Sequence, residues 1–322
     1  MFEMYSRLLL FSSFIQFRSS HKVIDLIQFN GDVLVDLRFS YLIDVVDLFA
    51  VVEGTHTFAG MRKEVLYMET HNDWFKKIEE SKKLLKIIYD DFSNTSISTD
   101  HQSQNNNLLV TKRESFQKDY AIQKILKFMG NESFILISSD ADEIPKRETI
   151  TYLIQDYEEL NNGAYLDMVN LFYSFKWIKN SKWQRAMVLN DRLLRKSVAN
   201  RITLHELRMI GEFTIIKNAG WHCSYCMSAE KIMHKISHSH FSENHFKNSN
   251  MNHSHVNISW IKYCIEHGID LFQRKDISEQ LHVYDGKQGY PIPVNGNITI
   301  DMLRDLPSRF DESGNVFLGF GG

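Results

Sequence analysis

The segment Phe134–Pro145, with the sequence FILISSDADEIP, constrains the fold of this chain more than any other. A short apolar run with β-branched residues ends in three acidic residues and a proline, which is the pattern of a buried strand that stops at the surface. In open α/β sheets, ligands bind where the central strands end. We therefore expect an α/β fold with a mainly parallel central sheet and a binding site at the acidic end of this strand.

Asp140 and Asp142 are spaced so that one cation can bind both carboxylates. Residues two apart in an extended segment point to the same side, and Glu143 lies beside them. Mg²⁺ and Mn²⁺ prefer oxygen ligands and often share them with substrate phosphates, so the pattern predicts a divalent-cation site for a nucleotide diphosphate. The alternative is an acidic loop that caps the next helix, because Asp and Glu also favour helix N-termini.

The composition is that of a soluble globular protein. The chain has 322 residues, of which 43% are apolar and 24% charged, and its net charge is -3 at pH 7. This charge gives no indication of a nucleic-acid partner. The apolar stretch Leu8–Phe17 is shorter than the about 20 residues of a membrane span, and no other stretch is long enough. We therefore expect no membrane span and a cytoplasmic rather than a membrane-anchored protein.

Strand and helix patterns alternate along the chain, as they do in a parallel α/β sheet. We expect strands over residues 45–52 and 84–89, an extended segment over 165–175, helices over 116–128, 148–160 and 228–236, and a polar surface loop over 93–107. We divide the chain into an N-terminal extension (1–22), one large domain (23–300) and a C-terminal tail (301–322).

A second distinctive segment is AGWHCSYC, residues 219–226. Its cysteines, Cys223 and Cys226, have the C-x-x-C spacing of a zinc half-site, and an H-x-x-x-H pair follows at a distance shorter than in a zinc finger. A disulfide is a second alternative, since only Cys264 would then be unpaired. Packed thiols are the third, and we expect them, with no catalytic zinc, because aromatic residues flank both cysteines.

These segments, with two others in a fixed order, resemble glycosyltransferase family 17. The resemblance spans roughly residues 23–290 and lies in four blocks. They are FNG (29–31) through FAVVE (49–53) and TFAG (57–60); Arg113, Glu114 and Gln117; DADEIP (140–145); and AGWHCSYC (219–226) followed by Lys235, Ser237, His240 and Glu243.

The resemblance implies a GT-A-like nucleotide-sugar transferase fold. It also implies the activity that typifies the family, that of a β-1,4-mannosyl-glycoprotein 4-β-N-acetylglucosaminyltransferase of N-glycan processing. Such an enzyme moves N-acetylglucosamine from a UDP-sugar donor to a glycan or glycoprotein acceptor, with inversion at the anomeric carbon and a divalent cation, Mn²⁺ or Mg²⁺.

Within this resemblance, the metal would be held by Asp140 and Asp142, with His240 as a further ligand. An inverting reaction needs a base that deprotonates the acceptor hydroxyl, and Glu230, at the start of the predicted helix 228–236, is our candidate beside Asp142. The alternatives are a plain helix-start acid at Glu230 and a surface or core histidine at His240.

Four further residues are expected to bind the donor. Arg113 suits a diphosphate, because guanidinium groups bind phosphates well, and Trp221 can stack on a sugar ring or on uracil. Glu53 and His222 lie in the same family blocks. For Trp221, packing in the core is an equal alternative.

These residues are also compatible with two functions from other classes. One is a non-catalytic metal, zinc or glycan-binding module, which predicts stoichiometric zinc and no donor binding. The other is an inactive transferase-like fold that serves as a binding protein. The intact pair of Asp140 and Asp142 favours an enzyme over both.

Overall fold

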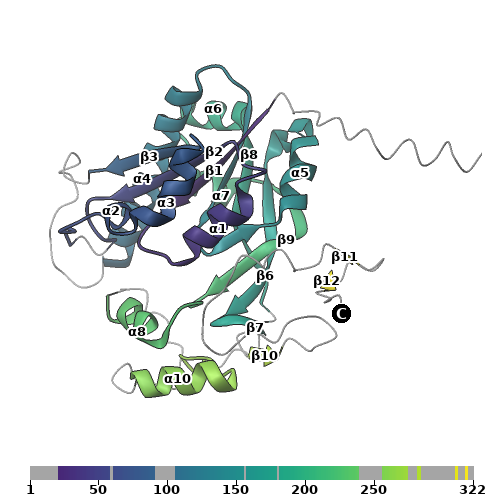
Figure 1. Ribbon diagram of the computed structural model, residues 1–322. Coiled ribbons are helices and arrows are strands. Elements are labelled where there is room, and N and C mark those ends of the chain that lie inside the picture. The colour runs from purple at the N-terminus through teal and green to yellow at the C-terminus, as the bar shows by residue number, and fades with distance from the viewer. Residues whose placement is uncertain are drawn as a thin grey trace, which may run out of the picture.

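The computed structural model describes residues 21–58, 61–90, 106–155, 157–179, 181–238, 256–274, 281–283, 309–310 and 316–317 (Figure 1). Its strands are β1 (Lys22–Gln28), β2 (Leu48–Gly54), β3 (Leu84–Tyr89), β4 (Phe134–Asp140), β5 (Glu143–Pro145), β6 (Ala164–Phe172), β7 (Ser174–Lys179), β8 (Trp183–Asn190), β9 (Thr214–Ser224), β10 (Leu281–Val283), β11 (Arg309–Phe310) and β12 (Val316–Phe317). Its helices are α1 (Leu34–Leu42), α2 (Tyr67–Thr70), α3 (Asn72–Glu80), α4 (Asn106–Met129), α5 (Arg147–Gln155), the 3₁₀ helix η2 (Tyr157–Asn162), α6 (Asp191–Ala199), α7 (Leu204–Ile210), α8 (Ala229–His238) and α10 (Ile258–His267).

The main sheet has the strand order β10-β7-β6-β8-β4-β1-β2-β3, and β9 pairs with both β6 and β5. Strands β3, β2, β1 and β4 are parallel, which confirms the predicted parallel sheet around the acidic segment. The other half is mixed, because β8 runs antiparallel to both β4 and β6 while β9 is parallel to β6. Since Gln28 lies opposite Asp140 in the β1–β4 register, the ends of these two strands open on the same edge.

Helices cover both faces of the parallel half of the sheet. Alternate residues of a strand point to opposite faces, and both faces carry apolar side chains that must be buried. On one face Ile27 and Ile137 pack with α1, α3 and α5. On the other face Leu26 and Leu136 pack with α4, α6 and α7. Each of these side chains is at most 1% exposed, and burial of one such side chain contributes about 1.5–3 kcal/mol. The result is the three-layer arrangement visible in Figure 1.

A third apolar cluster lies beside the extended ends of β6, β7 and β9, where α8 and α10 pack together (Figure 1). Its buried members include Phe172, Ile232 and Ile261. The predicted extended segment 165–175 is interrupted at Tyr173, which has a φ of 63° and separates β6 from β7. This backbone conformation is uncommon for a residue other than glycine.

The predicted elements differ from the observed ones mainly at their ends. The strand over 84–89 coincides with β3, whereas β2 is shifted and ends at Gly54. Helix α4 begins at Asn106, inside the polar segment predicted to be a loop, of which residues 93–105 lie outside the described residues. The helix predicted over 148–160 is α5 followed by η2.

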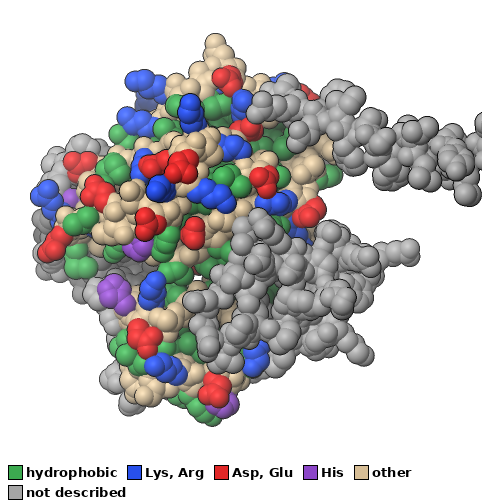
Figure 2. All heavy atoms as spheres, viewed as in Figure 1, with side chains coloured by type: hydrophobic (Ala, Val, Ile, Leu, Met, Phe, Trp, Pro, Cys, Tyr) green, Lys and Arg blue, Asp and Glu red, His purple; other side chains and the backbone are tan. Residues whose placement is uncertain are grey.

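No helix in the described ranges is both long enough and apolar enough to cross a bilayer. Acidic and basic side chains are interspersed on the face shown in Figure 2, in keeping with the small net charge of -3.

A buried ion pair joins the first strand, the first helix and the end of β4. The Arg38 guanidinium on α1 contacts both carboxylate oxygens of Asp25 on β1, at 2.8 and 2.5 Å, and both side chains are fully buried. The same guanidinium donates to the carbonyl oxygens of Asp140 and Glu143, each at 2.7 Å, and to Ser139 Oγ at 2.6 Å. The conformation of the turn after β4 therefore depends on a helix a hundred residues earlier in the chain.

We predict that Arg38→Met destabilises the protein strongly. Removing one partner of a buried ion pair leaves the other charge without compensation, which costs about 3–5 kcal/mol. Urea unfolding should show this loss. The matched control is Arg192→Met, whose exposed pair with Glu158 should leave the free energy of unfolding nearly unchanged. Equal, small effects of both substitutions would contradict the role that we assign to Arg38.

Candidate functional site at the end of β4

The two segments singled out in the sequence meet in the structure. Strand β5 pairs with β9, so that Glu143 lies opposite His222. The carbonyl oxygen of Asp142 accepts a hydrogen bond from the N–H of Cys223 at 3.0 Å. The acidic turn is therefore held on one side by Arg38 and on the other by the edge of β9.

Gly220 allows this approach of β9 to β5. A Cβ atom at this position would lie 2.4 Å from the carbonyl oxygen of Ile144, so any other residue would force the two strands apart. A glycine serves here because it lets another backbone approach closely.

Asp140 is held ionised at the edge of the site. Its side chain is 46% exposed and lies 3.0 Å from Nζ of Lys118 on α4. Burial alone would raise the pKa of Asp140, but the charge and hydrogen bond of Lys118 override it and lower this pKa to about 2. Lys118 also contacts Glu114 one helical turn earlier, at 3.0 Å. The sequence analysis missed Lys118, although it directly follows the family block that contains Gln117.

The buried carboxylate of Glu143 binds the backbone of the turn and a neighbouring tryptophan. Its carboxylate accepts the N–H of Asp140 at 2.9 Å and the indole N–H of Trp183 at 2.6 Å. The side chain is buried, and burial, followed by the charge of Asp140, raises its pKa to about 7. Glu143 is thus a group that positions Asp140, and it is not a carboxylate open to solvent.

The pKa of Asp142 is shifted in the opposite direction to that of Asp140. Its side chain is 17% exposed, and burial raises its pKa well above the usual value, with the charges of Asp32, Asp140 and Glu143 adding to the effect. Lys235 on α8 opposes this shift. Asp32 belongs to the loop after β1, which the β1–β4 register places at the same sheet edge. The sequence analysis did not identify Asp32 or Lys235 as part of this charge cluster.

His222 is a buried, neutral imidazole beside Asp142. The amide N–H of Asn170 donates to the Ser181 hydroxyl in the loop before β8. Its amide oxygen therefore lies 3.0 Å from Nδ1 of His222 as an acceptor, so Nδ1 carries the proton. Nε2 then accepts from the Ser224 hydroxyl at 3.1 Å. The ring stacks on Trp183 with centroids 3.5 Å apart. Burial lowers the pKa of His222 to about 3, so the ring acts as a fixed neutral group.

Trp221 faces away from this cluster. Neighbouring residues of a strand point to opposite faces, and Trp221 is buried in the core, edge-to-face with Tyr41 at a centroid distance of 5.9 Å. The packing alternative therefore describes Trp221 in this structure.

Glu53 and Arg113 hold the segment after β2. Glu53 is buried and accepts hydrogen bonds from Nζ of Lys63 and from two backbone N–H groups at the start of α2, at 2.7 to 2.8 Å. Arg113 donates to the carbonyl oxygen of Phe58 at 3.2 Å. Both oxygens of Glu53 are thus engaged within the protein.

Glu230 lies on the exposed side of α8, where it forms an ion pair of 3.0 Å with Lys262 of α10. Hydrogen bonds from its own backbone N–H and from Lys262 lower its pKa, which is the less favourable direction for a general base at neutral pH. The predicted metal ligand His240 lies outside the described residues.

Cys223 and Cys226 form a disulfide, with Cα atoms 5.6 Å apart. The prediction of two packed thiols is therefore wrong. Tyr225, which has a φ of 57°, turns the chain after β9 so that the two cysteines face each other. Cys264 is the free, buried cysteine, as the disulfide alternative required.

The carboxylates suit a cation that is shared with a substrate. Within the part of the chain that the structure describes, no group of three or more His, Cys, Asp or Glu side chains could hold a metal by itself. Mg²⁺, however, is commonly bound by one or two carboxylates together with phosphates and water. The candidate carboxylates are Asp140, which ends β4, and Asp142, in the turn before β5. They do not lie along one extended segment, contrary to the prediction from the sequence.

Comparison with known proteins gives a consistent result. The model of the family described as Glycosyltransferase family 17 matches residues 7–279. Among similar curated proteins are the β-1,4-mannosyl-glycoprotein 4-β-N-acetylglucosaminyltransferases of Rattus norvegicus and Homo sapiens, each 25% identical over 242 residues. The enzyme of Mus musculus is 24% identical over the same length. These matches cover 67% of this chain but only 42% of each relative, so the chain spans less than half of their length.

Among solved structures, a putative glucose-1-phosphate thymidylyltransferase from Bacillus anthracis, in complex with a sucrose, is similar at 9% identity. The match covers 62% of this chain and 88% of that one, with a TM-score of 0.34.

We predict that Glu143 makes stability depend on pH. Its pKa is about 7 in the folded protein against an ordinary value of 4.5, so the folded state binds its proton more tightly than the unfolded state. The stabilisation is complete below about pH 4.5 and is lost as the pH rises through about 7. Urea unfolding between pH 4.5 and 7.5 should show wild-type stability falling by more than about 1 kcal/mol relative to Glu143→Gln. Parallel pH profiles for the two proteins would refute this assignment.

Proposed function

The chain belongs to glycosyltransferase family 17, and from this membership we propose that it transfers N-acetylglucosamine from UDP-N-acetylglucosamine to a glycan acceptor, with inversion at the anomeric carbon. The observation that carries the proposal is the turn Asp140–Glu143 at the end of a central parallel strand, fixed by Arg38 and by β9. The parallel order β3-β2-β1-β4 supports a GT-A-type nucleotide-sugar fold.

In this proposal Asp140 and Asp142 hold a divalent cation, Mn²⁺ or Mg²⁺. The bound cation would supply the positive charge that stabilises the departing diphosphate. The chain itself prepares the ligands: Lys118 keeps Asp140 ionised, and Glu143 orients its backbone. His222, neutral and stacked on Trp183, gives the site a rigid wall beside Asp142.

The proposed base is Glu230, because an inverting transfer needs a group that accepts the proton of the acceptor hydroxyl. Helix α8, which carries Glu230, also carries Lys235, whose charge acts on Asp142. The helix therefore borders the acidic turn. Glu230 is paired with Lys262, so this role requires the acceptor to displace Lys262.

We propose a mannose-containing glycan or glycoprotein as the acceptor, because the named relatives act on a β-1,4-mannosyl glycoprotein. Since the chain spans less than half of their length, the acceptor must be tested directly on this protein.

We expect purified protein to release UDP from UDP-N-acetylglucosamine in the presence of Mn²⁺ and a mannose-terminated glycan. A panel with UDP-glucose and UDP-galactose tests the sugar, and EDTA tests the cation. Transfer that persists at full strength after EDTA would refute the metal role. Absence of transfer from every UDP-sugar, with donor binding absent by calorimetry, would favour a binding module.

We predict that Asp142→Asn separates catalysis from stability. Loss of a charged metal ligand should lower kcat/KM by about 100-fold or more. Because burial and like charges raise the pKa of Asp142, neutralising it removes repulsion, and the free energy of unfolding at neutral pH should not fall. The matched control is Glu158→Gln on the exposed surface of η2, which should leave both quantities unchanged. A large loss of stability in Asp142→Asn would instead indicate a structural carboxylate.

A further inference from the structure

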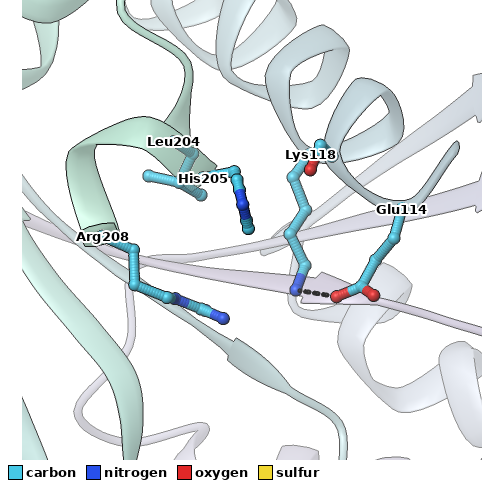
Figure 3. Close-up of a pocket in the computed structure, with 6 residues that line it drawn as sticks. Glu114, Lys118, Leu204, His205 and Arg208 are labelled. Carbon is cyan, nitrogen blue, oxygen red and sulfur yellow. Dashed lines mark hydrogen bonds and ion pairs between the residues drawn. The ribbon is translucent and has the colours of Figure 1, made fainter. Parts of the chain in front are cut away.

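A pocket opens between α4 and α7 (Figure 3). It is lined by Glu114, Ser115 and Lys118 of α4 and by Leu204, His205 and Arg208 of α7. Lys118 belongs to both places, because its Nζ lies 3.0 Å from Asp140 and 3.0 Å from Glu114. One lining residue of the pocket, Lys118, therefore also contacts the acidic turn.

Arg208 brings a second cation to this pocket. Figure 3 shows Arg208 and His205 reaching from α7 toward the space that Lys118 faces from α4. The Nε atom of Arg208 is buried, and the described residues offer it no hydrogen-bond partner. A buried charged donor without a partner is costly. Its charge nevertheless acts on both Asp140 and Lys118, so Arg208 lies near the site, and no described residue forms a direct ion pair with it.

The backbone beneath Arg208 is firmly held. Helix α7 starts with a reciprocal capping box between Thr203 and Glu206. The N–H of Leu204 donates to Asp119 of α4 at 2.9 Å, and the Tyr165 hydroxyl donates to the carbonyl oxygen of Arg208. These contacts fix the backbone that carries Arg208 before any ligand arrives, which lowers the ordering cost of binding.

The lining chemistry indicates the class of ligand. Lys118 and Arg208 are cations, the Ser115 hydroxyl can donate, and Glu114 is already paired with Lys118. A guanidinium presents a rigid fork of N–H groups that matches the oxygens of a phosphate or a carboxylate. The pocket thus offers more donors than acceptors, together with a guanidinium nitrogen, Nε of Arg208, that has no hydrogen-bond partner among the described residues.

We propose that the pocket between α4 and α7 binds a phosphate-type oxyanion, with Arg208 as its main ligand, and that the donor diphosphate is the source of this anion. The assignment of the source rests on the proposed function, whereas the anion site itself does not. Arg113, the residue that the sequence predicts to contact the diphosphate, donates to the carbonyl oxygen of Phe58 in this structure.

Titration calorimetry on the full chain, without added metal, tests the site with inorganic phosphate, UDP and uridine. The test variant is Arg208→Met, and the control is Arg192→Met, an exposed arginine paired with Glu158. We expect Arg208→Met to weaken binding of phosphate and UDP by about 10-fold or more, as for loss of a charge-assisted hydrogen bond. Uridine binding and the control variant should be unaffected.

The outcomes separate the two parts of the proposal. Wild-type affinity of Arg208→Met for both phosphate and UDP overturns the site. Weaker binding of phosphate alone supports the site and overturns the donor as its source. If Arg208→Met does not fold, Arg208→Lys decides, since it keeps the charge without the fork; unchanged phosphate affinity in this variant overturns the proposal. Phosphate binding requires no transfer, so absent transferase activity with intact phosphate binding counts against the proposed function alone.

Discussion

The buried pair of Arg38 and Asp25 is the interaction on which the rest of the site depends. Two charges removed from water are tolerated only when both are paired and their remaining hydrogen-bonding groups are used. Arg38 meets this requirement by donating to the carbonyl oxygens of Asp140 and Glu143. The turn after β4 is thus held by the buried guanidinium of Arg38.

The same turn explains why the two characteristic segments of the sequence occur together. The edge of β9 can approach β5 only because residue 220 is glycine, and this approach places His222 and the disulfide next to the acidic residues. One side of the turn is therefore fixed by the Arg38 guanidinium and the other by backbone pairing with β9. The carboxylates of Asp140 and Asp142 are partly exposed. Such rigidity is what a site needs if it is to bind charge without rearrangement.

The sequence alone predicted the parts of this arrangement that depend on local pattern. An apolar run followed by acids indicated a central strand that ends at the acidic residues, and β4 ends at Asp140 as expected. Long-range pairing was not predictable in the same way. Arg38 and Lys118 belong to helices, where a charge ordinarily indicates a solvated face, yet both are buried against residues distant in the chain. Neighbouring residues of a strand point to opposite faces, so only one of Trp221 and His222 can face the site. The pairing of β9 with β5 places His222 there, and this long-range pairing was not visible in the sequence.

The third apolar cluster has a consequence for the order in which the protein opens. Helices α8 and α10 pack on the ends of β6, β7 and β9 through a cluster separate from the two that cover the parallel sheet. Structural units with their own apolar contacts can unfold locally at a lower free energy than the whole molecule. Opening of this unit would withdraw Lys235 from the acidic turn while Arg38 kept the turn intact. Amide hydrogens of α8 would then exchange with solvent sooner than those of β1 and β4. Each opening would also remove the positive charge of Lys235, which lowers the pKa of Asp142.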